Sequence, residues 1–230
     1  MNVCFPIENK TGEIWTLKED APIIGSGVSG TVHLACRDQN CNYVFKWVDF
    51  TSSRRIDKEA KNFKREVAIH MSMARSNLAP PIYAHKICAK GTSGGFITKI
   101  VDMTIRNYLE DEDTVLDDWE RLLEMGLTLL KQMHAKNYYH GDAHIGNFML
   151  EKINSNDLDQ PNQVHLSRGY YRMYVIDFGR SDRIVPKSES AKQHRIRMSM
   201  TPKSLVDKDN SQYKTSMRII YRDLVFRGAL

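Results

Sequence analysis

Residues 138–149 read Tyr-Tyr-His-Gly-Asp-Ala-His-Ile-Gly-Asn-Phe-Met, and two polar side chains in this stretch restrict the folds that suit the chain. Asp142 supplies a carboxylate that can take a proton from an attacking hydroxyl. Asn147, five residues later, supplies an amide oxygen that can hold a metal ion. These groups can serve phosphate chemistry only if the fold also brings up a phosphate cradle and a second metal-binding carboxylate. The sequence provides a candidate for each, one before and one after this stretch.

A glycine-rich stretch at residues 25–32, Gly-Ser-Gly-Val-Ser-Gly-Thr-Val, is the candidate phosphate cradle. Glycine lets the backbone turn tightly and approach an anionic phosphate without a Cβ atom in the way, and Val32 can cover a flat nucleobase. An ordinary glycine-containing hairpin gives the same pattern, so the stretch alone is weak evidence. Residues 31–36 continue as a strand, whereas a dinucleotide-binding turn opens a helix. The residues expected to contact phosphate are Gly25, Ser26, Gly27, Val28, Ser29 and Gly30.

Lys46 interrupts an otherwise apolar strand at residues 43–48. A charge in such a run is costly unless it is paired, so the sequence should provide an acidic partner. Residues 56–73 predict a helix, and Glu66 lies beside its apolar stripe, as expected for a side chain that faces the core. Glu59 is the rival partner, and either glutamate could instead be a solvated residue of a highly charged helix. The stripe consists of Phe63, Val67, Ile69 and Met73.

Asp177 is the candidate for the second metal-binding carboxylate. It follows the β-prone run Met-Tyr-Val-Ile at residues 173–176, and Gly179 then releases the backbone from the strand. Taken alone, this pattern is little more than a turn that ends a strand.

The four segments, in this order, resemble the motifs of the protein kinase superfamily over about residues 20–182. The resemblance implies an α+β, two-lobed protein-kinase-like fold that binds ATP and Mg²⁺. A single kinase domain would span residues 1–230. Its β-rich N-lobe would occupy about residues 1–100, its reduced helical C-lobe core about residues 101–182, and a short basic C-terminal segment residues 183–230.

The resemblance also implies a role for each candidate residue. Lys46 would position the phosphates of the nucleotide, and Glu66 would hold Lys46 in place. Asp142 would accept or orient the proton of the acceptor hydroxyl. Asn147 and Asp177 would bind Mg²⁺.

Three positions in and around the 138–149 stretch bear on the kind of kinase. His140 is expected to brace the loop rather than transfer a proton. Gly141 replaces the arginine that receives an activation-loop phosphate in many kinases, so the sequence predicts no activation through that switch. His144 stands where serine/threonine kinases usually carry a lysine. The loop also resembles those of aminoglycoside and choline kinases, of small atypical protein kinases and of lipopolysaccharide kinases, so the loop alone leaves the acceptor open.

The spacing of the segments favours a protein kinase. About 40 residues separate the predicted strand 95–101 from His140, which is room for a short helix and one amphipathic helix at residues 119–136. Only 51 residues follow Gly179, and they contain no Ala-Pro-Glu sequence. The chain therefore resembles minimal kinases, such as those of the KEOPS tRNA-modification complex, the RIO family and short effector or viral kinases.

This resemblance implies a serine/threonine protein kinase that acts on a protein substrate and takes an activating protein partner. Two alternatives stay open. A small-molecule kinase would keep the same residues but change the acceptor. A pseudokinase or a basic-tailed nucleic-acid-binding module is disfavoured, because Lys46, Asp142, Asn147 and Asp177 are all intact.

Composition indicates an intracellular protein. The chain of 230 residues is 41% hydrophobic and 27% charged, and it contains no apolar run of the length that spans a membrane. Its first residues lack the basic and apolar regions of a secretory signal. We expect a cytoplasmic location, including the cytoplasm of a host cell or a virion, and no membrane. Four cysteines, at positions 4, 36, 41 and 88, lack metal-binding spacing and are expected to be reduced structural thiols.

The C-terminal part of the chain is basic. Residues 180–230 contain 12 Lys and Arg against 5 Asp and Glu. A solvated surface explains this surplus, and so does contact of residues 183–230 with a polyanion such as an acidic protein, RNA or DNA. Residues 153–168 predict a long exposed hairpin loop, and residues 216–227 predict a final helix.

Overall fold

The computed structural model describes residues 4–17, 23–27, 30–51, 55–88, 91–111, 113–154 and 162–226. The described residues form both helices and strands, so the predicted α+β class is confirmed. The chain divides into two compact units. Unit 1 comprises residues 1–75, 80–100 and 177–179, and unit 2 comprises residues 76–79, 101–176 and 180–230.

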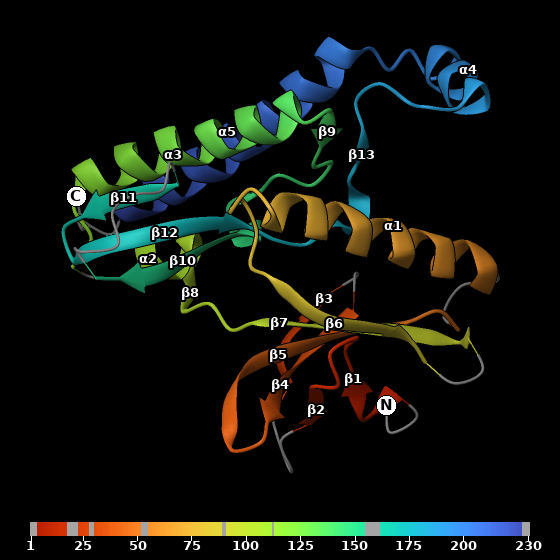
Figure 1. Cartoon of the computed structure of the whole chain (residues 1–230). Helices are drawn as coiled ribbons and strands as arrows, with labels where there is room; N and C mark the ends of the chain where they lie inside the picture. The colour runs from red at the N-terminus through yellow and green to blue at the C-terminus, as the bar shows by residue number, and fades with distance from the viewer. Residues whose placement is uncertain are drawn as a thin grey trace. The chain divides into compact units, whose positions relative to one another are not determined.

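Unit 1 is an antiparallel sheet with one helix on it (Figure 1). The strands follow the order β1-β2-β4-β5-β7-β6, and β3 pairs with β4. The elements are β1 (Ile7–Glu8), β2 (Ile14–Leu17), β3 (Ile23–Gly27), β4 (Gly30–Arg37), β5 (Asn40–Asp49), α1 (Ile56–Ala74), β6 (Ile82–Ile87) and β7 (Ser93–Lys99).

Alternation along β5 sends neighbouring side chains to opposite faces of the sheet. Tyr43 and Phe45 are buried in a cluster with Trp15 and Ile97 on one face. Lys46, the next residue after Phe45, therefore points to the other face, on which α1 packs.

The apolar stripe of α1 covers that second face. Phe63 and Val67 of the helix pack against Phe50 and Phe96 of the sheet unit. Phe96 is the register partner of Lys46 on β7, so the same face of the sheet carries both the lysine and the contact with α1. The predicted helix 56–73 and its stripe are confirmed.

All four cysteines form disulfides, Cys4–Cys88 and Cys36–Cys41, so the prediction of reduced thiols is wrong. The spacing of the cysteines in the sequence shows only whether they match a metal-binding motif. Which cysteines can form a disulfide depends on how the fold brings them together. The β4–β5 hairpin turns at residues 38–39 and brings positions 36 and 41 together. Disulfides are typical of oxidising environments, and the cytoplasmic location stays a prediction.

Unit 2 combines a four-stranded sheet, ordered β11-β12-β10-β8, with two long helices. A two-stranded ribbon of β9 and β13 lies beside them. The elements are β8 (Met103–Thr104), α2 (Ile105–Leu109), α3 (Leu116–Ala135), β9 (Tyr138–Tyr139), the 3₁₀ turn η3 (Ile145–Asn147), β10 (Phe148–Ile153), β11 (Gln163–Leu166), β12 (Gly169–Val175), β13 (Asp182–Arg183), α4 (Glu189–Arg197) and α5 (Pro202–Phe226). The short turn η5 (Phe178–Arg180) straddles the two units.

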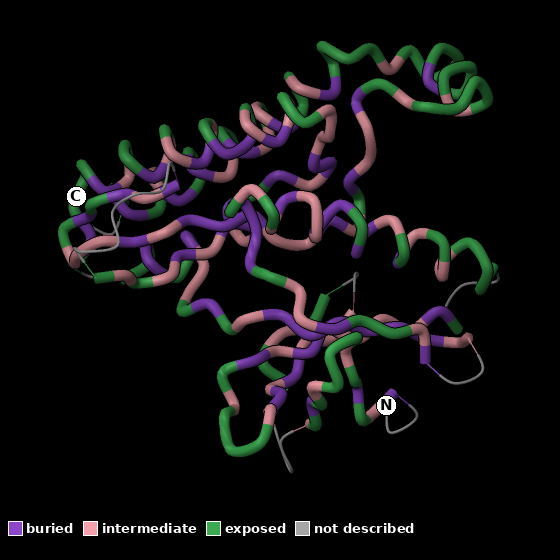
Figure 2. The backbone as a smooth tube through the Cα atoms, viewed as in Figure 1, coloured by how far each residue is buried: buried purple, intermediate pink, exposed green. Residues whose placement is uncertain are grey.

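Helices α3 and α5 lie side by side, and their facing sides are buried (Figure 2). Tyr213 of α5 packs against Gly126 of α3, where a Cβ atom would collide with the ring. The Tyr213 hydroxyl donates to the carbonyl of Leu122 at 2.7 Å, and the Trp119 indole N–H donates to the carbonyl of Met217 at 3.0 Å. Because these contacts are buried and satisfied, α5 is an integral part of the core of unit 2.

Two sequence predictions for unit 2 need correction. The final helix begins at Pro202 rather than at residue 216, since buried residues recur every three or four positions from Leu205 onward. The predicted exposed loop 153–168 contains a strand, β11, which pairs with β12 and buries Val164 and Leu166. Residues 155–161 of that loop lie outside the described residues. No helix in the described ranges is long and apolar enough to cross a membrane.

Candidate functional site

Lys46 lies between two carboxylates in unit 1. Its Nζ atom is 2.6 Å from Oε1 of Glu66 and 2.7 Å from Oδ1 of Asp177. The side chains of Lys46 and Glu66 are only 12% and 6% exposed. The pairing of Lys46 with Glu66 is confirmed, while Glu59, the rival, accepts instead from Asn62 at 3.2 Å.

Burial and charge pairing have opposite effects on the pKa values of Lys46 and Glu66. Burial lowers the pKa of Lys46, but the charges and hydrogen bonds of Glu66 and Asp177 outweigh it, so the pKa of Lys46 is raised and the ammonium is retained. Burial raises the pKa of Glu66, with the Lys46 charge opposing that effect. Two carboxylates face one ammonium, so a cation beside Asp177 would compensate the surplus negative charge. This donor set is one that suits a hard cation such as Mg²⁺.

His70 is a buried neighbour of this cluster that sequence reasoning missed. It lies one helical turn after Glu66, and its ring packs edge-to-face on Phe96 and Phe178, with centroids 5.4 and 5.3 Å away. Its Nε2 atom is 2.8 Å from the carbonyl oxygen of Pro80. Burial lowers the pKa of His70 to about 4, so the ring is neutral at neutral pH. The sequence did contain an indication of its burial, because His70 follows Phe63 and Glu66 at helical spacing and so lies on the same side of α1.

The glycine-rich stretch forms the hairpin β3–β4 beside Lys46. Val32 is the register partner of Lys46 on β5 and of Gly25 on β3. Gly30 has φ +128°, and a Cβ atom there would collide with the backbone carbonyl of Trp47, so only glycine fits. Ser26 and Gly27 belong to β3, while positions 28 and 29, predicted as phosphate contacts, lie outside the described residues.

His140 is fully buried in unit 2 and braces its loop, as predicted. Its Nδ1 atom accepts from the backbone N–H of Asp142 at 3.3 Å, so Nε2 carries the proton and donates to the carbonyl of Ile176 at 2.9 Å. Asn147 donates from its side-chain Nδ2 to the carbonyl of Asp142 at 2.9 Å. That bond orients the amide, and the remaining amide oxygen is the atom suited to a metal ion.

Asp209, on α5, anchors the 140–147 loop through its backbone and was also missed by sequence reasoning. Its carboxylate is fully buried and accepts from the backbone N–H groups of His140 at 2.7 Å and Gly141 at 2.8 Å. It also lies 2.9 Å from Nε2 of His134 on α3. In the sequence, only its spacing relative to the apolar residues of α5 indicated that Asp209 is buried. The loop geometry therefore depends on a helix about 70 residues further along the chain.

No family model matches the chain, and no curated protein matches its sequence. The interpretation of the site therefore rests on its residues and their contacts.

Gly141 occupies a position that excludes other residues. Its φ is +79°, and a Cβ atom there would lie 2.5 Å from the carbonyl oxygen of Arg180. A larger side chain such as arginine at this position would collide with that backbone. Arg180 itself places Nη1 3.5 Å from Oδ1 of Asp142.

The predicted site residues thus fall into two sets. Lys46, Glu66 and Asp177 come together in unit 1, and Asp142 and Asn147 come together in unit 2. Ile176, the residue before Asp177 in the chain, donates its N–H to the carbonyl of Asn147 at 2.9 Å.

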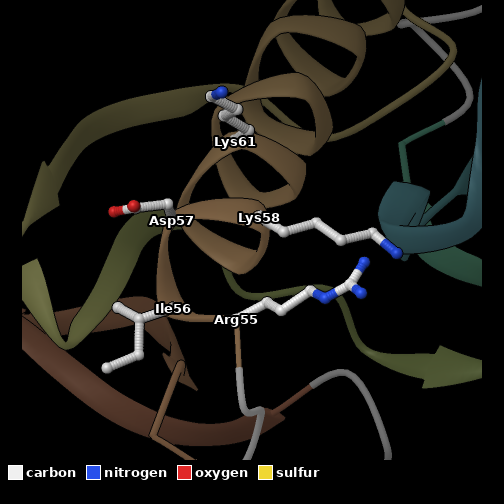
Figure 3. Close-up of a pocket in the computed structure, with 5 residues that line it drawn as sticks. All are labelled: Arg55, Ile56, Asp57, Lys58 and Lys61. Atoms are coloured by element: carbon white, nitrogen blue, oxygen red, sulfur yellow. The ribbon is translucent and has the colours of Figure 1, made fainter.

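A separate hollow of about 750 Å³ opens at the start of α1 (Figure 3). Arg55 and Lys58 extend to one side of the helix start, whereas Ile56 and Asp57 point to the other. Lys61 completes its described lining, so this lining contains none of the predicted site residues.

Proposed function

We propose that the chain is an ATP- and Mg²⁺-dependent phosphotransferase with a two-lobed protein-kinase-like fold, acting on serine or threonine of proteins. The observation that carries the proposal is the buried Lys46 held between Glu66 and Asp177. Burying the charged groups of Lys46 and Glu66 beside a third, partly exposed one is costly, and apolar residues would fill a purely structural position at a lower cost in free energy. The cluster therefore supports a functional site.

Each residue has a defined part in the proposed reaction. Lys46 binds phosphate oxygens of the nucleotide, and Glu66 fixes the direction of the lysine. Asp142 accepts the proton that the acceptor hydroxyl loses as its oxygen attacks the terminal phosphate. Asn147 and Asp177 provide the oxygen atoms that would hold Mg²⁺, which neutralises phosphate charge when bound.

The contacts around the 140–147 loop support a fixed position for the base. Asp209 holds the backbone at His140 and Gly141, and Asn147 holds the carbonyl of Asp142. A preorganised carboxylate gains most of its effect from such positioning.

Transfer of radiolabelled phosphate from ATP, in the presence of Mg²⁺, tests the proposal. The acceptors are a mixed protein lysate, an aminoglycoside and choline, so that the label reports the acceptor class. We expect label in protein serine and threonine. Label in the aminoglycoside or choline alone would instead establish a small-molecule kinase, and no label in any acceptor would refute phosphotransfer.

A matched pair of variants on α1 connects the activity to the cluster. Glu66→Gln removes a buried charge from Lys46, and we expect kcat/KM to fall about ten- to hundredfold. Glu59→Gln changes the same residue type on the same helix but leaves Lys46 untouched, so its kcat/KM should match the wild type. Equal kcat/KM values for the two variants would contradict the role assigned to Lys46.

A further inference from the structure

Residues 180–203, here named the basic segment, concentrate the positive charge of the chain. They contain seven Lys and Arg against two Asp and Glu, a surplus of five that equals the formal net charge of the whole chain. Both acidic residues have cationic neighbours. Asp182 Oδ2 lies 3.6 Å from Nη2 of Arg195, and Glu189 Oε2 lies 3.3 Å from Nζ of Lys192. Of the other cations, Arg180 lies near Asp142 and Lys203 pairs with Asp207, while Lys187 and Arg197 are exposed and supply cationic surface.

The start of the basic segment is fixed against the 140–147 loop. Strands β9 and β13 pair with Asp182 opposite Tyr139, and the Ser181 hydroxyl donates to the carbonyl of His140 at 3.0 Å. Arg180, the first residue of the segment, has its guanidinium 3.5 Å from the Asp142 carboxylate. The Arg180 side chain is 58% exposed and that of Asp142 is 27% exposed, so both can be reached from solvent. An acceptor whose hydroxyl reaches Asp142 must therefore lie beside this guanidinium.

Helix α4 continues the basic segment and is held by one buried arginine. Arg195 is the only buried residue of α4. Its guanidinium donates to the carbonyls of Arg183 and Ile184 and lies 5.4 Å from the centre of the Tyr139 ring. These contacts tie α4 to β9 and β13, and apart from Arg195 and the half-buried Ala191 the residues of α4 are exposed.

Apolar side chains are interleaved with these cations. Ile196, Met198 and Val185 are 69%, 60% and 52% exposed. The basic segment contains no Phe, Tyr or Trp, the side chains that usually form the stacking platform for single-stranded nucleic acids. A surface that mixes exposed aliphatic side chains with lysine and arginine is complementary to an acidic polypeptide.

We propose that the basic segment binds the phosphate acceptor, and that this acceptor is an acidic polypeptide with carboxylates next to its serine or threonine. Arg180 is the specificity-determining residue nearest the reacting hydroxyl, and Lys187 and Arg197 attract the flanking acidic residues. The inference rests on the phosphotransferase function proposed above. In the transfer, the acceptor oxygen bonds to the terminal phosphorus of ATP, its proton goes to Asp142, and the bond to ADP breaks.

Two peptides test this inference with the full-length chain. One carries a serine flanked by glutamates, and the other carries the same serine flanked by glutamines. The readouts are the kcat/KM of each peptide with ATP and Mg²⁺, and the dissociation constant of each labelled peptide without ATP. An unstructured single-stranded RNA is the competitor in the binding measurement.

The variants distinguish the effect of the basic segment on acceptor binding from the effect of the net charge of the protein. Arg180→Gln tests the guanidinium beside Asp142, and the double variant Lys187→Gln/Arg197→Gln tests the outer cations. The matched control is Lys214→Gln/Arg218→Gln, which removes the same charge from exposed positions of α5.

We expect the wild type to prefer the glutamate peptide by about tenfold in kcat/KM and in affinity. Arg180→Gln and the outer double variant should each reduce that ratio about threefold, while the α5 control should keep it. Equal use of the two peptides by an active enzyme, an unchanged ratio in the variants or tighter binding of the RNA than of the glutamate peptide would overturn the inference. A glutamate preference in binding without phosphate transfer to any acceptor would refute the phosphotransferase function instead.

Discussion

Replacement of Asp209 by alanine removes the acceptor that holds the 140–147 loop. The carboxylate is fully buried and accepts from the backbone N–H groups of His140 and Gly141. Alanine leaves both donors buried without that partner, and each such group costs about 1–3 kcal/mol. We therefore expect the free energy of unfolding to fall by about 4 kcal/mol in Asp209→Ala. Asp209→Asn keeps one acceptor oxygen and should lose about half as much.

Urea titration measures this loss, and amide hydrogen exchange locates it. The exchange rates of the His140 and Gly141 amides should rise more than those of other buried amides in unit 2. Asp207→Ala is the control, because Asp207 lies on the same helix but is exposed and pairs with exposed Lys203. Its urea midpoint should stay close to that of the wild type. If Asp209→Ala and Asp207→Ala unfold at the same urea concentration, the anchoring role of Asp209 is wrong.

Other perturbations probe separate parts of the structure. Alanine at position 141 would have a left-handed backbone conformation and a Cβ atom too close to a carbonyl oxygen, whereas alanine at position 91 would have only the left-handed conformation. In thermal unfolding, Gly141→Ala should therefore be less stable than Gly91→Ala by at least about 1 kcal/mol. The folded chain keeps His70 neutral down to about pH 4, while the unfolded chain protonates this residue below its ordinary pKa of 6.5. Stability should therefore fall by up to about 3 kcal/mol between pH 6.5 and pH 4 in the wild type relative to His70→Gln, and equal pH profiles would exclude this contribution. A disulfide restricts the unfolded chain more when it closes a longer loop, and Cys4–Cys88 closes a span of 84 residues whereas Cys36–Cys41 closes a span of 5. Replacing the first pair by serine should therefore lower the free energy of unfolding, measured in urea, by about 2 kcal/mol more than replacing the second. Equal losses would contradict this argument.

The parts of the site that sequence predicted are those with a local signature. A lone lysine in an apolar strand demands a partner, and helical periodicity places Glu66, rather than Glu59, beside the core stripe. The ion pair between Lys46 and Glu66 confirmed that reasoning. The strand before Asp177 was accessible in the same way, because it depends on neighbouring residues. The bracing role of His140 was expected from the kinase resemblance, and the contact that carries it reaches Ile176, 36 residues further along the chain.

The parts that sequence missed depend on contacts between distant segments. Asp209 looks like an ordinary acidic residue of a polar helix, and only the packing of α5 on α3 makes it an anchor for His140 and Gly141. The Cys36–Cys41 disulfide follows from the register of β4 and β5, and the Cys4–Cys88 disulfide joins segments 84 residues apart, and local propensity specifies neither. His70 was hidden for another reason, since a histidine in an apolar stripe is usually a core residue, and its contact with Phe178 joins segments about a hundred residues apart.

The most direct test of phosphotransfer is the rate at which Asp142→Asn transfers labelled phosphate from ATP to protein, compared with the wild type. Asparagine keeps the shape of the side chain but cannot take the acceptor proton, so we expect kcat to fall about a hundredfold or more with little change in nucleotide affinity. Asp113→Asn, at an exposed position in unit 2, is the matched control and should transfer phosphate at the wild-type rate. Wild-type kcat in Asp142→Asn would contradict the proposed mechanism.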